Sequence, residues 1–306
     1  MASNLSSPHF HDEDAAFAYV EARVWPTGPV CPHCGGVERI SKMQGQSTRK
    51  GLYKCYQCRK PFTVRMGTIF ESSKVPLHVW LQAMYLVAGS KKGISSHQLA
   101  RTLGLTVKTA WFLSHRIREA MREGGFDLFG SDGGAVEVDE TYIGRKAGAV
   151  TNPKGGWGHK MTVLGLVDRN TGQSRLFHVD GGKEIQGIVL ENLSREARLM
   201  TDEHIMYRRI GREFAEHSAV YHYNKEYVRG DVTTNTVEGA FSIFKRGMRG
   251  VYQHCAEKHL HRYLAEFEFR YSHRIALGVD DAARADKMLR GIVGKRLTYQ
   301  TASARA

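Results

Sequence analysis

The spacing of hydrophobic and polar positions divides the chain into three segments. Up to about Lys74 there are few long periodic runs, whereas from Val75 to Glu123 apolar residues recur at the spacing of amphipathic helices. A stretch rich in glycine and aspartate at 124–134 then leads into a segment that alternates strand-like and helix-like runs. The pattern predicts a small module, a helical region and an α/β domain.

The helical region has the pattern of a helix-turn-helix. Pro76 stands where a first helix can begin. Four apolar residues then recur at helical spacing: Trp80, Ala83, Met84 and Val87. Ser95 and Thr106 are placed to cap two further helices, and Gly104 supplies the turn between them. A helical pair that serves only packing has the same pattern, so the motif alone leaves both interpretations open.

The third segment begins as a β-meander followed by a crossover helix. Strand-like patterns cover 136–143, 161–167 and 174–179. Apolar residues between 185 and 193 form one stripe of a helix, after which a short apolar run from Leu199 ends in Asp202. This order predicts an α/β fold with a mixed sheet and flanking helices.

Composition is that of a globular protein, and the charge is concentrated in one block. Of 306 residues 42% are hydrophobic and 25% charged, and no run approaches the roughly 20 apolar residues of a membrane span. The net charge is +13, and between Arg39 and Arg118 there are 15 basic residues against one acidic residue, Glu71. We expect a polyanion as partner, no membrane association and a cytoplasmic, nucleoid-associated location, a solvated cationic surface being the alternative.

Four of the five cysteines form two CxxC pairs at the spacing of a zinc site. The pairs are Cys31/Cys34 and Cys55/Cys58, with 20 residues between them. Two thiolates three positions apart can hold one tetrahedral ion, and the second pair completes the ligand set. A redox pair would need one CxxC near a βαβ unit, and disulfides would need an oxidising compartment. We therefore expect structural Zn²⁺ in a zinc ribbon at 15–74.

Basic residues near the second cysteine pair and on the second helix of the predicted helix-turn-helix are candidates for DNA contacts. Those near the cysteines are Lys54, Arg59 and Lys60. Those on the helix, opposite its apolar face, are Lys108, Thr109, His115 and Arg116. Such a helix can enter the major groove, and lysines and arginines can meet phosphates. We expect the helix-turn-helix-like DNA-binding region to span 75–125.

Carboxylates in the third segment suggest a metal site. Glu137 and Asp139 share one face of the strand at 136–143, where an acidic pair is costly unless a cation or water faces it. Asp202 ends a later strand, and Glu238 lies on a predicted helix. Divalent ions held by carboxylates from separate elements are the requirement of phosphodiester chemistry, so we expect catalytic Mg²⁺ or Mn²⁺ here.

The helix that contains Glu238 has a polar stripe opposite its buried face. Asn235, Glu238 and Lys245 lie on this stripe. Lys245 is placed to contact a phosphate near the phosphodiester bond that such a site would cut. Alternatively, Asn235 as N-cap and Glu238 at its third position form an ordinary capping arrangement. That alternative leaves the acidic pair on the strand unexplained.

Asp139, Asp202 and Glu238, with 35 residues between the last two, resemble the D, D(35)E triad of retroviral-integrase-like transposases. More closely, the chain resembles bacterial insertion-sequence transposases of the ISXO type, which have a zinc ribbon, a helix-turn-helix-like region and an RNase H-like catalytic domain. The matching parts are the four cysteines of the CxxC pairs and residues 138–144, 201–202, 227–230, 235–238, 245–246 and 260–270.

The resemblance implies an RNase H-like DDE domain at 132–280, followed by a C-terminal tail at 281–306. Asp139 and Asp202 would then bind the catalytic metals, and Glu238 would complete the site. Some relatives are described by Asn in the third place, which allows Asn235 to share that role. The departures are Thr233, Phe241 and Ser272, where the family leads us to expect His, Trp and Asn.

The activity implied by the resemblance is DNA transposition. The protein would bind the terminal inverted repeats of an insertion sequence and target DNA, and would perform metal-dependent cleavage and strand transfer. A homo-oligomer is expected when it is assembled on DNA. Two alternatives remain: a zinc and helix-turn-helix regulator without catalysis, and a metal-dependent nuclease that does not join strands.

Overall fold

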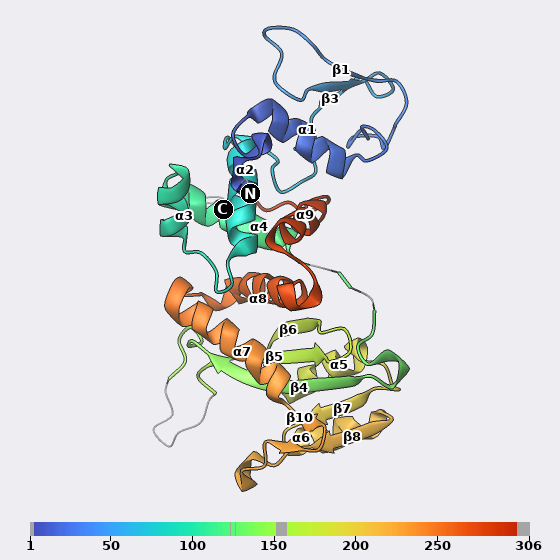
Figure 1. Cartoon of the computed structure of the whole chain (residues 1–306), viewed down its shortest axis with the longest axis vertical. Coiled ribbons are helices and arrows are strands. Elements are labelled where there is room, and N and C mark those ends of the chain that lie inside the picture. The colour runs from blue at the N-terminus through green and yellow to red at the C-terminus, as the bar shows by residue number, and fades with distance from the viewer. Residues whose placement is uncertain (1–2, 123, 126, 151–157, 299–306) are drawn as a thin grey trace. The chain divides into compact units, whose positions relative to one another are not determined.

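The computed structural model describes residues 3–122, 124–125, 127–150 and 158–298. The chain forms two compact units (Figure 1). The first combines Met1–Ser90, Ile94–Arg122 and Asp280–Ala306, and the second combines Lys91–Gly93 with Glu123–Val279. No described helix has the length and apolar composition of a membrane span.

The first unit begins with helix α1 (Glu13–Val24) and a small antiparallel sheet of order β1-β2-β3. The strands are β1 (Ile40–Lys42), β2 (Tyr53–Cys55) and β3 (Pro61–Phe62). Trp25, Tyr53 and Phe62 pack together beside buried Cys31 and Cys55. So small a sheet has little core of its own, which is typical of a module stabilised by a metal.

Helices α2 (Leu77–Gly89), α3 (Ser96–Leu103) and α4 (Val107–Ala120) form the helical part of this unit. Ser95 caps α3 by accepting from the Gln98 amide at 3.1 Å, and Thr106 caps α4 by accepting from the Thr109 amide at 3.2 Å. Gly104, at the end of α3, has a φ of 64°, a left-handed conformation that glycine adopts without strain. The predicted caps and turn are confirmed.

The predicted tail at 281–306 instead begins with helix α9 (Asp281–Arg290), which packs on α2. Asp280 caps α9, and Arg284, 6% exposed, donates to a main-chain carbonyl of α2 at 3.0 Å. The alternation of charged and small residues in α9 hides this packing from a sequence-based interpretation. The prediction of a tail is wrong for the residues of α9, and 299–306 lie outside the described residues.

The second unit contains a five-stranded mixed sheet of order β6-β5-β4-β7-β8. Its strands are β4 (Ala135–Ile143), β5 (Met161–Asp168), β6 (Ser174–Val179), β7 (Arg198–Thr201) and β8 (Glu216–Ala219). β5 is antiparallel to both neighbours, whereas β7 is parallel to β4 and to β8. The mixed sheet with flanking helices is confirmed, and its order fits the RNase H-like fold that the resemblance implies.

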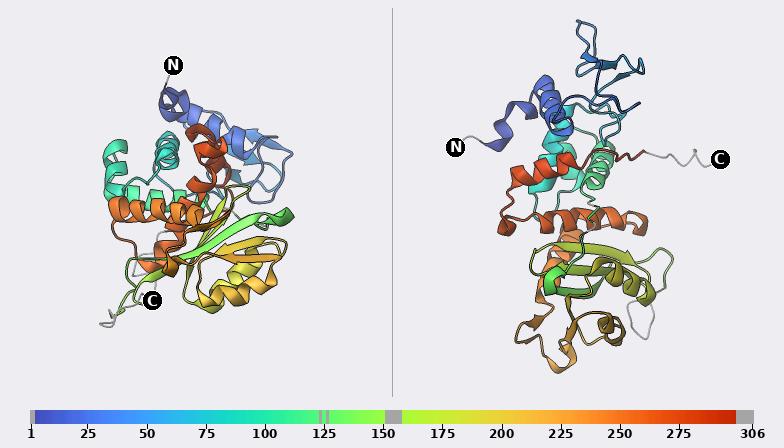
Figure 2. Two further views of the ribbon diagram at one scale, coloured as in Figure 1. Left: turned by 60° about the horizontal axis from the view of Figure 1, so that its bottom comes forward. Right: turned by 90° about the vertical axis from the view of Figure 1, so that its right-hand side faces the viewer.

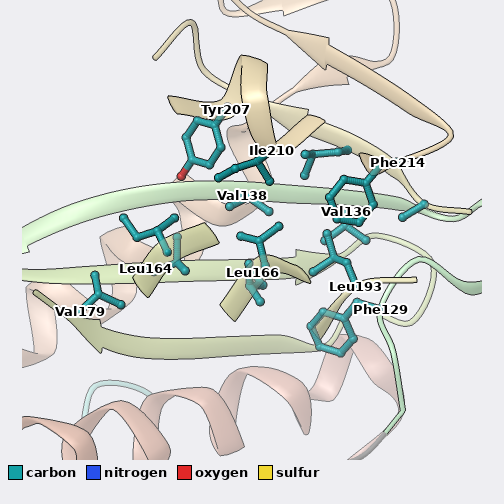
Figure 3. Close-up of a cluster of buried hydrophobic side chains, with 14 residues drawn as sticks. Phe129, Val136, Val138, Leu164, Leu166, Val179, Leu193, Tyr207, Ile210 and Phe214 are labelled. Carbon is teal, nitrogen blue, oxygen red and sulfur yellow. The ribbon is translucent and has the colours of Figure 1, made fainter. Parts of the chain in front are cut away.

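Helices cover both faces of this sheet (Figure 2). They are α5 (Gly182–Asn192), α6 (Ile205–Ile210), α7 (Asn235–Gly247) and α8 (Glu257–Ser272). One core joins α5 and α6 to Val136 and Val138 of β4 (Figure 3). The other joins α7 and α8 to Val163 and Val167 of β5. The face of β4 that bears Glu137 and Asp139 therefore lies under α7.

Short elements complete the connections. A hairpin of β9 (Val228–Arg229) and β10 (Val232–Thr233) lies between β8 and α7. Tight 3₁₀ turns occur at Asn4–Ser6, Pro8–Phe10, Ser131–Gly133, Gly211–Glu213, His222–Asn224 and Ile275–Leu277, and α7 continues into a π-helical turn at Met248–Tyr252.

Candidate metal centres and active site

The four predicted zinc ligands lie together. All four sulfur atoms lie within 4.8 Å of one another, those of Cys31, Cys34, Cys55 and Cys58. The Sγ atoms of Cys31 and Cys58 are 3.6 Å apart, and those of Cys34 and Cys55 are 3.7 Å apart. Four thiolates at such spacing fit a tetrahedral zinc ion.

The main chain supports this sulfur cluster. Gly35 has a φ of 71° and donates to the carbonyl of Cys31 at 2.9 Å, which closes the first knuckle. The backbone N–H of Cys58, with that of Gln57, lowers the pKa of the Cys55 thiol to about 7. A thiol with a lowered pKa yields the thiolate that binds metal.

The predicted DNA contacts near the cysteines divide by exposure. Arg59 and Lys60 are exposed, whereas Lys54 is half-buried with its ammonium 5.3 Å from the Tyr56 ring centre. Phe62, by contrast, is 1% exposed and supports the small sheet. Arg59 and Lys60 are therefore accessible to a phosphate backbone.

The prediction for the second helix is wrong for two residues. Lys108 is exposed and Thr109 half-buried at the beginning of α4, but His115 is 1% exposed and Arg116 is 4% exposed. Arg116 donates to the carbonyl of Glu71 at 2.5 Å, and burial lowers its pKa to about 10. The second half of α4 is surrounded by protein on all sides, so His115 and Arg116 contribute to the core and not to a DNA-facing surface.

Parallel pairing of β4 with β7 brings Asp139 and Asp202 to the same end of the sheet. Glu137 pairs with Met200 in this register. Two residues further along the chain on each side, the same register places Asp139 beside Asp202. Asp202 directly follows the last residue of β7. Ligands bind at the carboxyl ends of parallel strands in α/β sheets, and this is such an edge.

Glu238 reaches this edge from α7. Thr234 donates its hydroxyl to Glu238 Oε1 at 2.8 Å, and His222 Nε2 lies 3.8 Å from the same oxygen. The side chain of Glu238 is 41% exposed, so a substrate or ion has access to it. Sequence reasoning missed Thr234 and His222, because neither lies on the polar stripe of the helix.

The three carboxylates interact electrostatically. Burial, together with the charges of Glu140, Asp202 and Glu238, raises the pKa of Asp139 to about 8. Among the described residues, Asp139, Asp202 and Glu238 do not form a group in which one carboxylate oxygen from each lies within 4.8 Å of the other two.

Lys245 lies two turns along α7 from Glu238. Its ammonium is within the electrostatic influence of Asp139 and Glu238, while burial lowers its pKa. Lys245 is therefore positioned on the side of the helix that faces the acids, as the polar stripe predicts.

Glu137 is not exposed to a metal site, although the strand pattern places it on the same face of β4 as Asp139. Its carboxylate is fully buried and accepts three hydrogen bonds from the start of α7. The donors are the amides of Thr236 at 2.7 Å and Val237 at 2.9 Å, and the Thr236 hydroxyl at 2.7 Å. Arg169 Nε lies 3.6 Å from the same carboxylate. Glu137 thus binds the first turn of the helix that presents Glu238.

The alternative in which Asn235 caps this helix is also wrong. α7 begins at Asn235 itself, after Thr234, and Thr234 makes no side-chain cap. The orphan amides of the first turn are satisfied by Glu137 instead. Asn235 is exposed at the first position of the helix, close in sequence to Glu238.

A glycine allows α7 to lie close to the sheet. Gly165 of β5 pairs with Asp139 across the strands. A Cβ at this position would lie 2.7 Å from Phe241 Cζ and 3.0 Å from Val237 Cγ2 of α7. Only a residue without a side chain permits this approach, which sets the distance between α7 and the strand that bears Asp139.

A second group of possible ligands consists of His178, Asp180 and Glu257. His178 Nε2 lies 3.4 Å from Glu257 Oε1, and Lys146 donates to Asp180 at 2.8 Å. The lysine already neutralises one of the carboxylates, so we assign no metal to this group.

Comparison with known proteins identifies the family. The sequence model of the ISXO2-like transposase domain matches residues 132–272, which include Asp139, Asp202 and Glu238. The model of the transposase zinc-ribbon domain matches residues 11–61, which include all four clustered cysteines. The chain belongs to the ISXO-type insertion-sequence transposases.

A relative supports the same assignment. An uncharacterized protein in transposable element ISH50 of Halobacterium salinarum is 28% identical to this transposase over 265 residues, which cover 80% of this chain and 86% of that protein. The similarity thus spans most of both chains. The transposase family and the zinc ribbon predicted from the sequence are confirmed.

Proposed function

We propose that this transposase binds the ends of its insertion sequence and cuts and joins DNA strands at a site formed by Asp139, Asp202 and Glu238. The observation that supports the proposal most directly is that Asp202, just after β7, and Glu238 of α7 lie within electrostatic reach of Asp139 on β4. Burial, and then the charges of Glu140, Asp202 and Glu238, raise the pKa of Asp139, and a divalent cation would stabilise the ionised acids.

Asp139, Asp202 and Glu238 are the residues that would hold Mg²⁺ or Mn²⁺. When bound, the metal would supply Lewis acidity for activation of a water or a 3′-hydroxyl and for stabilisation of the leaving oxygen. The regulator without catalysis gives no reason for three acids to meet at this edge.

Other residues would position the acids and the substrate. Thr234 fixes one oxygen of Glu238 by donating to it at 2.8 Å, which orients the other oxygen outward. Lys245 would contact a phosphate group near the reacting bond, since its charge already lies close to the acids. Asn235 is exposed in the first turn and would serve as an additional polar contact.

The first unit would hold the DNA ends. Its exposed basic residues Arg59, Lys60 and Lys108 lie in the block with the excess of positive charge, and such residues bind phosphates without regard to sequence. A structural Zn²⁺ bound by Cys31, Cys34, Cys55 and Cys58 would stabilise the ribbon. We expect two or more copies to assemble on DNA, because two ends must be joined.

Strand cleavage and strand transfer with labelled terminal DNA of the element test the proposal. With Mg²⁺, the wild type should release the element end and join it to target DNA, while Asp139→Asn and Glu238→Gln should lose both activities by at least about 10²-fold. Glu191→Gln, an exposed acid on α5, is the matched control and should retain both.

Three outcomes separate the candidate functions. Cleavage without joining identifies a nuclease, and DNA binding without either reaction identifies a regulator. Cleavage that persists in Asp139→Asn at the wild-type rate would show that the reaction occurs elsewhere.

A further inference from the structure

A polar cavity lies on the side of Asp202 opposite Asp139. The strand order β4-β7-β8 places Asp139 on one side of β7 and the end of β8 on the other. The cavity, with a volume of about 210 Å³, is lined by Asp202 and by residues of α6, β8 and β9, among them Arg208 and Arg229. It therefore adjoins the carboxylate edge without including Asp139 or Glu238.

Two guanidinium groups face this cavity from different elements. Arg208 of α6 is exposed and makes no hydrogen bond or ion pair with any residue that the structure describes. Arg229 of β9 is held in place, since it donates to the carbonyl of Ala219 at 2.9 Å and lies 3.4 Å from Glu226. One fixed and one uncommitted arginine suit a phosphate, whose oxygens accept several hydrogen bonds at once.

The two acids that line the cavity have partners other than the arginines. Glu203 accepts from the amides of His222 at 2.8 Å and Tyr223 at 3.1 Å, so its carboxylate is occupied by the main chain. Asp202 is one of the residues that would hold a metal under the proposed function. Arg208, which makes no ion pair with any described residue, is then the cation left to attract a ligand, and that ligand is an anion.

An exposed aromatic ring lies on the turn that Glu203 fixes. Tyr223 is 90% exposed, although burial of an aromatic ring stabilises a protein. Tyrosine rings at the surface of DNA-binding proteins stack on unpaired bases, at about 1–3 kcal/mol per base. Arginines that can bind a phosphate and a tyrosine that can stack on a base together indicate that the ligand is a nucleic acid strand and not a free anion.

We propose that this Arg208/Arg229 pocket binds a backbone phosphate of the DNA strand next to the bond that is cut, and that Tyr223 stacks on a base of the same strand. The proposal rests on the proposed function for the location of the cut bond. It assigns the pocket the task of fixing the strand relative to the carboxylates, so that the correct phosphodiester lies at Asp139 and Asp202.

Arg209 provides a matched control for the test. It is the next residue of α6, it is equally exposed, and it does not line the cavity. In the full-length zinc-loaded protein, we expect Arg208→Gln to lower kcat/KM for cleavage of terminal DNA about tenfold and Arg208→Lys to recover part of the loss. Arg209→Gln should stay within about twofold of the wild type.

Two further measurements separate the pocket from the proposed function. A neutral methylphosphonate at the phosphate beside the cut should slow the wild type but add little to the loss in Arg208→Gln, because the two changes remove one contact. Binding of a single-stranded oligothymidylate needs no catalysis, and Arg208→Gln should reduce the slope of log Kd against log salt by about 0.7 relative to Arg209→Gln.

The outcomes are distinct. Equal salt slopes and equal cleavage rates in Arg208→Gln and Arg209→Gln would overturn the pocket while leaving Asp139-dependent cleavage intact. A chain that cleaves no DNA but shows the slope difference would overturn the proposed function and support the pocket.

Discussion

Replacement of Glu137 tests whether the position of α7 controls the candidate active site. The buried carboxylate accepts three hydrogen bonds from the first turn of α7, at 2.7, 2.7 and 2.9 Å. Glu137→Gln keeps the shape of the side chain, but it replaces one acceptor oxygen by an amide donor that faces other donors. Hydrogen bonds to a charged group contribute about 1.5–3 kcal/mol each, so we expect a loss of about 2–4 kcal/mol in the free energy of unfolding.

The effect on the reaction should exceed the effect of lower stability. If α7 shifts, Glu238 moves relative to Asp139 and Asp202, and the site binds metal less well. We expect cleavage to fall at least about tenfold at a temperature where the variant is folded, and the Mg²⁺ concentration for half-maximal rate to rise. Thermal unfolding followed by circular dichroism and a Mg²⁺ titration of the cleavage rate measure the two effects separately.

Asp168→Asn is the matched control for Glu137→Gln. Asp168 is 4% exposed and also accepts three hydrogen bonds, all from backbone N–H groups of Gly130, Asn170 and Thr171, but it does not bind α7. Its replacement should cost similar stability and leave the Mg²⁺ dependence unchanged. The reasoning is refuted if Glu137→Gln is destabilised like the control while its Mg²⁺ dependence stays at the wild-type value.

Three further substitutions test other parts of the structure. Gly165→Ala places a Cβ 2.7 Å from the Phe241 ring, so calorimetry should show a loss of about 1–3 kcal/mol, and cleavage should fall with it; unchanged values would show that α7 can move aside freely. Cys58→Ser should abolish zinc binding, measured as metal content, and unfold the ribbon while the second unit remains folded; a full zinc equivalent in the variant would contradict the four-sulfur site. Asp139→Asn should stabilise the magnesium-free protein at neutral pH. The raised pKa of about 8 means that the folded state holds a proton which the unfolded chain releases near pH 4, so this acid destabilises the fold increasingly as pH rises from about 4 to about 8. The Asn variant should lack this slope and be more stable at pH 8, on the order of 1–3 kcal/mol; identical pH profiles in urea unfolding would contradict the assignment.

Local signals predicted much of the fold because they depend on near neighbours in the sequence. Ser95, Thr106 and Gly104 act within one helical turn, and the alternation in β4 and the apolar run in β5 can be recognised along each strand alone. Strand β8 was not predicted, since its sequence Glu216–Ala219 has no apolar alternation and pairs only with β7. An edge strand of polar residues depends on its neighbour, which the sequence does not reveal.

The candidate site shows the same division. The acids were found from their chemistry and from the resemblance, and the structure brings them to one edge. The role of Glu137 was missed because its hydrogen-bond partners lie 99 and 100 positions later. His115 and Arg116 were assigned to DNA because polar residues on a helix normally face solvent, but α4 is surrounded by its own unit and both side chains are buried. Burial depends on the tertiary structure and not on helical period.

The 35 residues between Asp202 and Glu238 have a structural explanation. After Asp202 the chain forms α6 and then β8, which lies parallel to β7. It then passes through the hairpin β9–β10 and reaches the opposite face of the sheet, where α7 begins. The return ends at a fixed point, because Glu137 of β4 binds the first turn of α7. The segment also supplies Arg208 and Arg229, which line the cavity beside Asp202. The spacing of the triad therefore follows from one sheet connection that both orients Glu238 and, under our proposal, holds the DNA strand beside it.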